Sequence, residues 1–219
     1  MNNTKAIIFD LDGVIVDTAK FHYLAWRKMA NDLDFDITLD QNEKLKGVSR
    51  VNSLQQILGW GNKTVTEAEF EQLMKSKNED YLARIAHMNE DDLLPGVKKT
   101  LDYLTENQIP FALGSASKNA RPILKGLKIE KRFKAIVDGN DVTKAKPDPE
   151  VFLIAAENLG VPPQDCIVFE DSVAGVEAAN AAGMVSIGIG DKEILKEADY
   201  NFADFTEIDN EFIEQIVRK

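Results

Sequence analysis

The chain has 219 residues, a formal net charge of -11 at pH 7 and 44% hydrophobic residues. A chain with this net negative charge does not provide the basic surface that nucleic acids and anionic membranes require, so we expect neither as a partner. The length and the apolar content suit one large domain or a core domain with a small insert, and we favour two units.

The only cysteine, Cys166, lies in the apolar run 166–169 and is therefore expected to be a buried hydrophobic residue rather than a nucleophile. The amino terminus has no cationic segment followed by an apolar stretch, and no run of about 18 apolar residues occurs. These features predict a cytoplasmic protein. No exposed apolar stripe stands out in the sequence, so we also expect a monomer.

The first predicted strand, residues 6–9, ends on two carboxylates, Asp10 and Asp12, followed by Gly13. If this strand belongs to a parallel sheet, its carboxyl end faces the crevice in which such sheets bind ligands. Two nearby carboxylates repel each other unless a cation binds or one of them is protonated. A hard cation such as Mg²⁺ would keep Asp10 ionised as a nucleophile, while Asp12 could carry a proton.

Residues 18–91 predict helices only, with helical spacing at 19–33, at 51–58 and, after a capping-box pattern, at 66–88. In the first of these helices, the pattern predicts one apolar face, with two further side chains, His22 and Trp26, beside it. The residues expected on the face are Phe21, Leu24, Ala25, Met29 and Leu33.

Three polar residues of this helical segment have both a structural and a functional interpretation. His22 suits a structural position or a proton relay. Arg50, at a helix start after Gly47, suits an exposed surface or an anion site. Lys77 continues the apolar row of the long helix, so its ammonium reaches either solvent or a ligand.

After Leu94, helices and strands alternate, which predicts a parallel sheet covered by helices. We expect helices at 97–107, 122–127, 150–159 and 173–182, strands at 109–114, 135–137, 166–169 and 185–189, and a final amphipathic segment through residue 216. The sequence therefore predicts an α/β core formed by 1–17 and 92–219, with a small helical insert at 18–91.

Further chemistry-bearing residues follow the predicted strands of the core. The loop 115–119 is small, polar and basic, and suits phosphate binding as well as an ordinary turn. Lys146 precedes Pro147. A proline prevents the following helix from extending toward the N-terminus and restricts the backbone of the residue before it, here Lys146. Glu170 and Asp171 form a second pair of strand-end carboxylates and are candidates for a hard metal ion.

Taken in order, the strand-end acids Asp10 and Asp12, then Ser115, Lys146 and the pair 170–171 resemble the four motifs of the haloacid dehalogenase superfamily. The resemblance spans nearly the whole chain. It implies a Rossmann-like parallel sheet with an inserted helical cap domain, and phosphoryl transfer through an aspartyl-phosphate with one Mg²⁺ per site.

The resemblance also implies roles for the core residues. Asp10 would be the nucleophile and Asp12 the general acid and base. The metal ligands would be Asp10, Asp12 through its main-chain carbonyl, Glu170 and Asp171. The reacting phosphate would be held by Ser115, Ala116 and Lys146.

In finer detail the chain is similar to phosphosugar mutases of this superfamily, which implies a sugar phosphate as the small-molecule partner and glucose 1,6-bisphosphate as activator or intermediate. His22 and Thr18 would then assist catalysis. The further substrate-binding residues that the similarity implies are Trp26, Leu45, Gly47, Val48, Ser49, Arg50, Ser53, Lys77, Ser117, Lys118 and Asn119.

Two other functions remain open from the sequence. A sugar-phosphate or phosphoglycolate-type phosphatase would use the same four motifs, with water completing the reaction, but would not require Arg50 and Lys118 to hold a second phosphate. A non-catalytic sugar-phosphate sensor could use the same fold, although it would have no need for the complete set of motif acids and bases.

Overall fold

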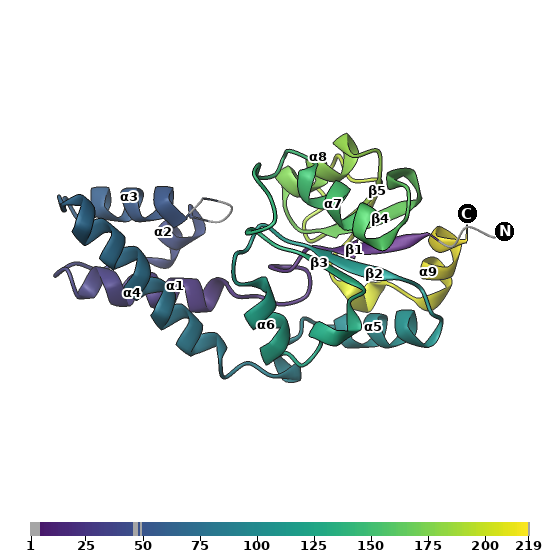
Figure 1. The fold of residues 1–219 in the computed structure, drawn as a ribbon, viewed down its shortest axis with the longest axis horizontal. Coiled ribbons are helices and arrows are strands. Elements are labelled where there is room, and N and C mark those ends of the chain that lie inside the picture. The colour runs from purple at the N-terminus through teal and green to yellow at the C-terminus, as the bar shows by residue number, and fades with distance from the viewer. Residues whose placement is uncertain (1–4, 46–47, 49, 219) are drawn as a thin grey trace. The chain divides into compact units, whose positions relative to one another are not determined.

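The computed structural model describes residues 5–45, 48 and 50–218, and the chain divides into two compact units (Figure 1). The first unit comprises Met1–Asp17 and Met88–Lys219, and the second comprises Thr18–His87. The sequence pattern placed the end of the insert at residue 91, whereas residues 88–91 are grouped with the first unit.

The described part of the first unit contains a six-stranded parallel sheet with the strand order β3-β2-β1-β4-β5-β6. This α/β architecture confirms the predicted fold class. The edge strand β6 was not predicted, because three residues are too short to show an alternating pattern. The strands are β1 (Ala6–Phe9), β2 (Phe111–Gly114), β3 (Ala135–Val137), β4 (Cys166–Glu170), β5 (Val185–Ile189) and β6 (Tyr200–Phe202).

Helices cover both faces of this sheet (Figure 1), with α7 (Glu150–Leu159) and α8 (Val173–Ala181) on one face and α5 (Val97–Glu106) and α9 (Asn210–Val217) on the other. The remaining helical segments of this unit are α6 (Ala120–Gly126) and the short 3-10 turns η1 (Glu90–Asp92), η2 (Glu130–Arg132), η3 (Pro163–Asp165) and η4 (Phe205–Glu207).

The central strand β1 is buried on both faces, because successive side chains of a strand point to opposite sides. Ile8 joins the apolar cluster that includes Phe152 of α7. Phe9 stacks on Phe169 at a ring-centroid distance of 5.2 Å and contacts Phe205 at 6.1 Å. This two-sided packing fixes the strand whose end carries Asp10.

The described part of the second unit consists of the helices α1 (Ala19–Asn31), α2 (Leu39–Glu43), α3 (Arg50–Trp60) and α4 (Glu67–Ile85). The predicted capping box starts α4, since Thr66 Oγ1 accepts from Glu69 N at 3.3 Å and Glu69 Oε2 accepts from Thr66 N at 2.7 Å. Gly59 was predicted to end the preceding helix, but α3 continues through it to Trp60.

The buried face of α1 differs from the predicted one. Ala25 and Met29 are buried as expected, but Trp26 is only 3% exposed and Leu24 is 40% exposed. Burying Trp26 removes more apolar surface from water than burying Leu24, so the helix presents the tryptophan side to the apolar cluster of the unit. Among the described residues, no helix has the length and apolarity needed to cross a membrane.

Candidate active site

Three neighbouring strands of the first unit bring the predicted core residues to one edge of the sheet. Asp10 follows β1, Ser115 follows β2, and Glu170 ends β4, with β1 between the other two. The main chain is held there, since Asp10 N donates to Phe169 O at 3.0 Å. The strand order reverses beside β1, which is where open parallel sheets bind their ligands.

Lys146 reaches this strand edge from the loop between β3 and α7. Its Nζ lies 2.5 Å from Asp10 Oδ1 and also donates to Glu170 Oε1, and its side chain is 9% exposed. Burial disfavours the ammonium, but attraction by Asp10 and Glu170 outweighs burial and raises the pKa of Lys146 above its ordinary value. Lys146 is therefore a fixed cation between two carboxylates.

The loop that carries Lys146 is anchored separately by Glu150, the first residue of α7. Glu150 Oε2 accepts hydrogen bonds from Thr143 N at 2.9 Å and from Lys144 N at 2.6 Å. These main-chain donors lower the pKa of the Glu150 carboxyl group. An ionised carboxylate thus holds the loop upstream of Lys146.

The cluster contains more carboxylates than a single ammonium can balance. Burial, together with repulsion by Glu170 and Asp171, raises the pKa of Asp10 well above its usual range, although Lys146 opposes the shift. Asp171 is exposed as a residue, yet partial burial of its carboxyl group and repulsion by Glu170 and Asp12 raise its pKa to about 7. Excess negative charge at this edge favours binding of a further cation.

The donor set suits a hard metal ion, since the candidate ligands are carboxylate and carbonyl oxygens. The backbone also leaves room for closely spaced carboxylates, because a Cβ on Gly13 would lie 1.9 Å from Asp171 Oδ2. Within the described residues, no three His, Cys, Asp or Glu side chains stand in a ready-made coordination geometry. The metal ligands predicted from the sequence therefore remain a prediction, supported by charge and donor chemistry.

Serine hydroxyl groups within the loop 115–119 accept hydrogen bonds from its own main chain. Ser115 Oγ accepts from Ser117 N at 3.1 Å, and Ser117 Oγ accepts from Asn119 N at 3.3 Å. Ser115 and Asn119 are buried, whereas Ala116 and Lys118 are exposed. The loop therefore offers main-chain atoms and the Lys118 ammonium to a ligand at the edge that also carries Asp10.

In the second unit, Lys77 is buried within a cluster of aromatic side chains. Its Nζ lies 2.9 Å from His22 Nδ1 and stands over the rings of Trp26, at 4.4 Å, and Tyr81, at 5.0 Å. Lys77 is only 2% exposed, so its side chain does not extend to solvent along the surface. Tyr81 was not predicted as a site residue, although its place one turn after Lys77 in the same apolar row indicates the contact.

The basic groups of this cluster form no ion pair with a carboxylate of the described residues, and the attraction of Asp80 raises the pKa of Lys77 less than burial and Arg50 lower it. Burial and repulsion by Arg50 lower the pKa of Lys77 to about 7, and burial with repulsion by Lys77 and Arg50 lowers the pKa of His22 to about 3. Among the described residues, no carboxylate lies within ion-pair distance of Lys77 or Arg50. Two partly or fully buried basic side chains that form no ion pair within the described residues favour the binding of an anion.

The other predicted residues of the second unit have varied surroundings. Ser53 is buried, and its Oγ donates to Val48 O at 3.4 Å. Leu45 packs in the apolar cluster of the unit, and Thr18 is buried at the start of α1. Gly47 and Ser49 lie outside the described residues.

Replacing Lys77 by methionine is expected to stabilise the protein. The pKa of Lys77 is about 7 in the folded chain against an ordinary value of 10.5, because burial disfavours its charged form. Burying this ammonium therefore lowers the free energy of unfolding by its full amount below pH 7, and the loss disappears as the pH rises through 10.5. Lys77→Met should therefore raise the free energy of unfolding by about 2 to 4 kcal/mol at pH 7 and change it little near pH 10.5.

Urea unfolding at the two pH values measures this difference. The matched control is Lys75→Met in the same helix, because Lys75 is 71% exposed and pairs with Glu79 at 4.0 Å. The control should change stability only slightly at both pH values. Equal unfolding midpoints for Lys77→Met and the control at pH 7 would contradict the desolvation of Lys77.

Comparison with known proteins agrees with these motifs. Residues 4–183 match the family model of the haloacid dehalogenase-like hydrolases. The chain is 46% identical to β-phosphoglucomutase of Bacillus subtilis over 197 residues, which are 89% of this chain and 87% of that protein. It is 31% identical to the phosphorylated carbohydrates phosphatase of Thermotoga maritima over 201 residues, which are 89% and 91% of the two chains.

The fold agrees as well. The crystal structure of β-phosphoglucomutase from Clostridium difficile superimposes with a TM-score of 0.87 at 42% sequence identity, and the match covers 98% of this chain and 97% of that chain. The motif residues brought together at the sheet edge, the match to the family model and this structural similarity lead to the same assignment. The chain belongs to the haloacid dehalogenase-like hydrolase family.

Proposed function

We propose that the protein is a β-phosphoglucomutase, which interconverts β-D-glucose 1-phosphate and glucose 6-phosphate through an aspartyl-phosphate and glucose 1,6-bisphosphate. The similarity to the Bacillus subtilis and Clostridium difficile mutases supports this substrate pair. The single structural observation that carries the choice of a mutase is a second group of basic side chains, the partly buried Arg50 and the buried Lys77 of the second unit, in addition to Lys146 beside Asp10.

The proposed chemistry begins on the carboxylate of Asp10. In its phosphorylated form, Asp10 donates the phosphoryl group to the C6 hydroxyl of glucose 1-phosphate, and Asp12 takes the hydroxyl proton. The product is the bisphosphate. After the bisphosphate has turned round, an Asp10 oxygen attacks the phosphorus at C1, the bond from phosphorus to the C1 oxygen breaks, and Asp12 returns the proton to that oxygen.

The residues around Asp10 stabilise charge during this transfer. Lys146 contacts Asp10 at 2.5 Å and, in this proposal, also binds an oxygen of the reacting phosphate together with Ser115 and Ala116. Mg²⁺, held by Asp10, the Asp12 carbonyl, Glu170 and Asp171, would offset negative charge on the transferring group. The raised pKa of Asp171, to about 7, agrees with a ligand set that is short of positive charge.

The second unit supplies the remaining substrate recognition in this proposal. Arg50 binds the second phosphate together with Ser117, Lys118 and Asn119, and Lys77 binds the sugar. His22, whose ring nitrogen contacts Lys77 Nζ, keeps Lys77 oriented. A neutral His22 can do this, because its pKa of about 3 leaves it uncharged near pH 7. The further predicted contacts, among them Trp26 and Ser53, then line this part of the site.

A phosphatase is the competing function, because the Thermotoga maritima relative is named for that activity. Both enzymes would phosphorylate Asp10, and they differ in whether a sugar hydroxyl or water accepts the phosphoryl group. A sensor without activity would do neither. The monomeric state and the cytoplasmic location expected from the sequence stay predictions.

Phosphorus NMR distinguishes these functions in one experiment. The protein is mixed with β-glucose 1-phosphate, Mg²⁺ and a trace of glucose 1,6-bisphosphate, and the products are followed over time. Glucose 6-phosphate supports the mutase. Inorganic phosphate as the main product would establish a phosphatase instead, and an unchanged spectrum would exclude both enzymes.

Arg50→Ala should separate the second phosphate site from the chemistry at Asp10. We expect mutase kcat/KM to fall about 100-fold, because a charge-assisted contact to phosphate is lost, while hydrolysis of para-nitrophenyl phosphate changes less than about 3-fold. Arg27→Ala is the control, since Arg27 lies in the same unit and is paired with Asp36 at 2.7 Å on the surface. Equal losses of both activities in Arg50→Ala would count against a second phosphate site.

A further inference from the structure

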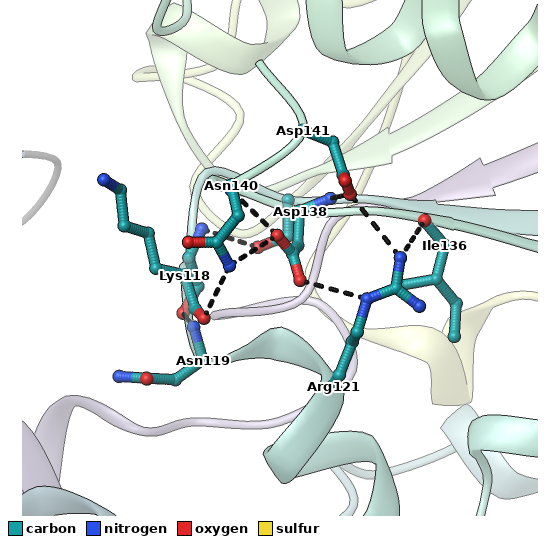
Figure 2. Close-up of polar contacts among 9 residues, drawn as sticks. Lys118, Asn119, Arg121, Ile136, Asp138, Asn140 and Asp141 are labelled. Carbon is teal, nitrogen blue, oxygen red and sulfur yellow. Dashed lines mark hydrogen bonds and ion pairs between the residues drawn. The ribbon is translucent and has the colours of Figure 1, made fainter. Parts of the chain in front are cut away.

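The turn after β3, residues 138–141, is built around a buried carboxylate that no step of the proposed reaction uses. Asp138 is 2% exposed, and its Oδ1 accepts from Asn140 N at 2.8 Å and from Asn140 Nδ2 at 2.9 Å. The turn is closed further by Asp141, whose Oδ2 accepts from Asp138 N at 2.9 Å. Figure 2 shows these contacts converging on Asp138. Asp138 therefore fixes both the main chain and the side chain of Asn140.

Asn140 connects this turn to the loop 115–119. Its Nδ2 donates to Lys118 O at 3.1 Å as well as to Asp138 (Figure 2). A side-chain amide nitrogen has two hydrogens, and here each has an acceptor. The direction of the bond to Lys118 is therefore set by the bond to Asp138.

A second contact joins the same two segments through the main chain. Gly139 N donates to Ser117 O at 3.2 Å. The approach is so close that a Cβ on Gly139 would lie 2.3 Å from Ala116 O and 3.1 Å from Lys118 Cγ. Both tethers hold carbonyl groups of the loop 115–119, so the peptide planes of Ser117 and Lys118 have little freedom to rotate.

Arg121 of α6 contacts the second carboxylate oxygen of Asp138. Its Nε lies 3.3 Å from Asp138 Oδ2, and its guanidinium group also donates to Ile136 O at 2.9 Å. The Arg121 side chain is 47% exposed, so this ion pair is expected to contribute less than the buried contacts of Asp138 with Asn140. In Figure 2, the side chains of Lys118 and Asn119 extend to the side away from Arg121.

We propose that Asn140, oriented by Asp138, is a positioning residue that sets the main chain of Ser117 and Lys118 and thereby directs Lys118 and Asn119 toward the second phosphate of the substrate. The inference rests on the proposed mutase function. It adds two residues, Asp138 and Asn140, which act through the loop rather than on the substrate itself.

The direct test replaces Asn140, which is exposed, so that the fold is retained. Asn140→Ala removes the tether and should raise the KM for β-glucose 1-phosphate about 3- to 10-fold with little change in kcat. Asn140→Asp has nearly the same shape but places an acceptor against Lys118 O and Asp138, so its KM should rise at least about 10-fold. A purely space-filling role would give the opposite order.

A small substrate tests whether the effect is confined to the second phosphate. Hydrolysis of para-nitrophenyl phosphate, which has no second phosphate, should change less than about 2-fold in both variants, because Lys146 lies on a stretch anchored separately by Glu150. Asn107→Ala is the matched control, since the exposed Asn107 also donates from Nδ2 to a main-chain carbonyl, Tyr103 O, at 2.9 Å. The control should leave both reactions unchanged.

The outcomes separate this inference from the function on which it rests. An unchanged KM in both Asn140 variants, or equal losses with both substrates, would overturn the positioning role while the wild type still forms glucose 6-phosphate. A wild-type protein that forms no glucose 6-phosphate would overturn the proposed function, and the role of Asn140 toward a second phosphate with it.

Discussion

Asp10→Asn is expected to abolish turnover without destabilising the protein. The substitution removes the proposed nucleophile, so kcat should fall at least about 10,000-fold with the sugar phosphate and with para-nitrophenyl phosphate alike. The melting temperature should be unchanged or higher. Burial and repulsion by Glu170 and Asp171 raise the pKa of Asp10, so at neutral pH its charged form is less favourable in the folded protein than in the unfolded chain.

The covalent intermediate provides a readout that is independent of turnover. After mixing with glucose 1,6-bisphosphate, the wild-type protein should gain the mass of one phosphoryl group in a form that is labile to hydroxylamine, and Asp10→Asn should not. Asp191→Asn is the control, because Asp191 also follows a strand of the sheet, β5, but is exposed. Retained activity in Asp10→Asn would exclude the aspartyl mechanism.

Lys146→Met is expected to have the opposite effect on stability, although it also abolishes turnover. Removing the ammonium leaves Asp10 and Glu170 buried without their shared cation. Breaking a buried ion pair from one side costs about 3 to 5 kcal/mol, so the free energy of unfolding should fall by that amount at pH 7 to 8. Turnover should fall at least about 1,000-fold, since a charge beside the transferring phosphate is lost.

Two conditions should restore part of the stability that Lys146→Met loses. The folded state holds a proton on Asp10 more tightly than the unfolded chain does, so between the raised folded pKa and the ordinary value of 3.8 stability increases as the pH falls. Millimolar Mg²⁺ should also raise the melting temperature of the variant, since a divalent cation can occupy the space between the carboxylates.

Thermal unfolding at pH 5.5 and pH 8, with and without Mg²⁺, measures both effects. The control is Lys144→Met, because Lys144 lies only two positions before Lys146 but is 68% exposed. Its Nζ pairs with Asp148 Oδ2 at 3.2 Å. This control should change stability by less than about 1 kcal/mol under every condition. A stability of Lys146→Met that equals the control at pH 8 would show that Lys146 does not compensate the two carboxylates.

The local elements of the first unit follow directly from the sequence. Strands β1, β3 and β5 and helix α7 have the predicted bounds, because each is a buried or amphipathic run between clear turn residues. The wrong face of α1 has a tertiary cause. Periodicity there permits two adjacent faces, and packing of Trp26 into the apolar cluster of the second unit selects one of them.

The candidate site was predictable where its residues follow strands of one parallel sheet. Strand ends meet at one edge, so the sequence alone groups Asp10, Ser115 and Glu170. Asp138 and Asn140 were not predicted, because a polar turn after a short strand has the composition of an ordinary loop. Their importance depends on a bond to Lys118, more than 20 positions away in the chain.

The sequence by itself determined the family, the order of the strands apart from β6, and the acids and bases proposed to carry the chemistry, since these depend on local pattern and on motifs in chain order. Only the tertiary structure decided the electrostatic state of these groups. Lys146 is held between Asp10 and Glu170, and Lys77 is buried against His22 and aromatic rings. Charge and pKa depend on which groups lie nearby and on how much water is excluded, and both are set by residues distant in sequence.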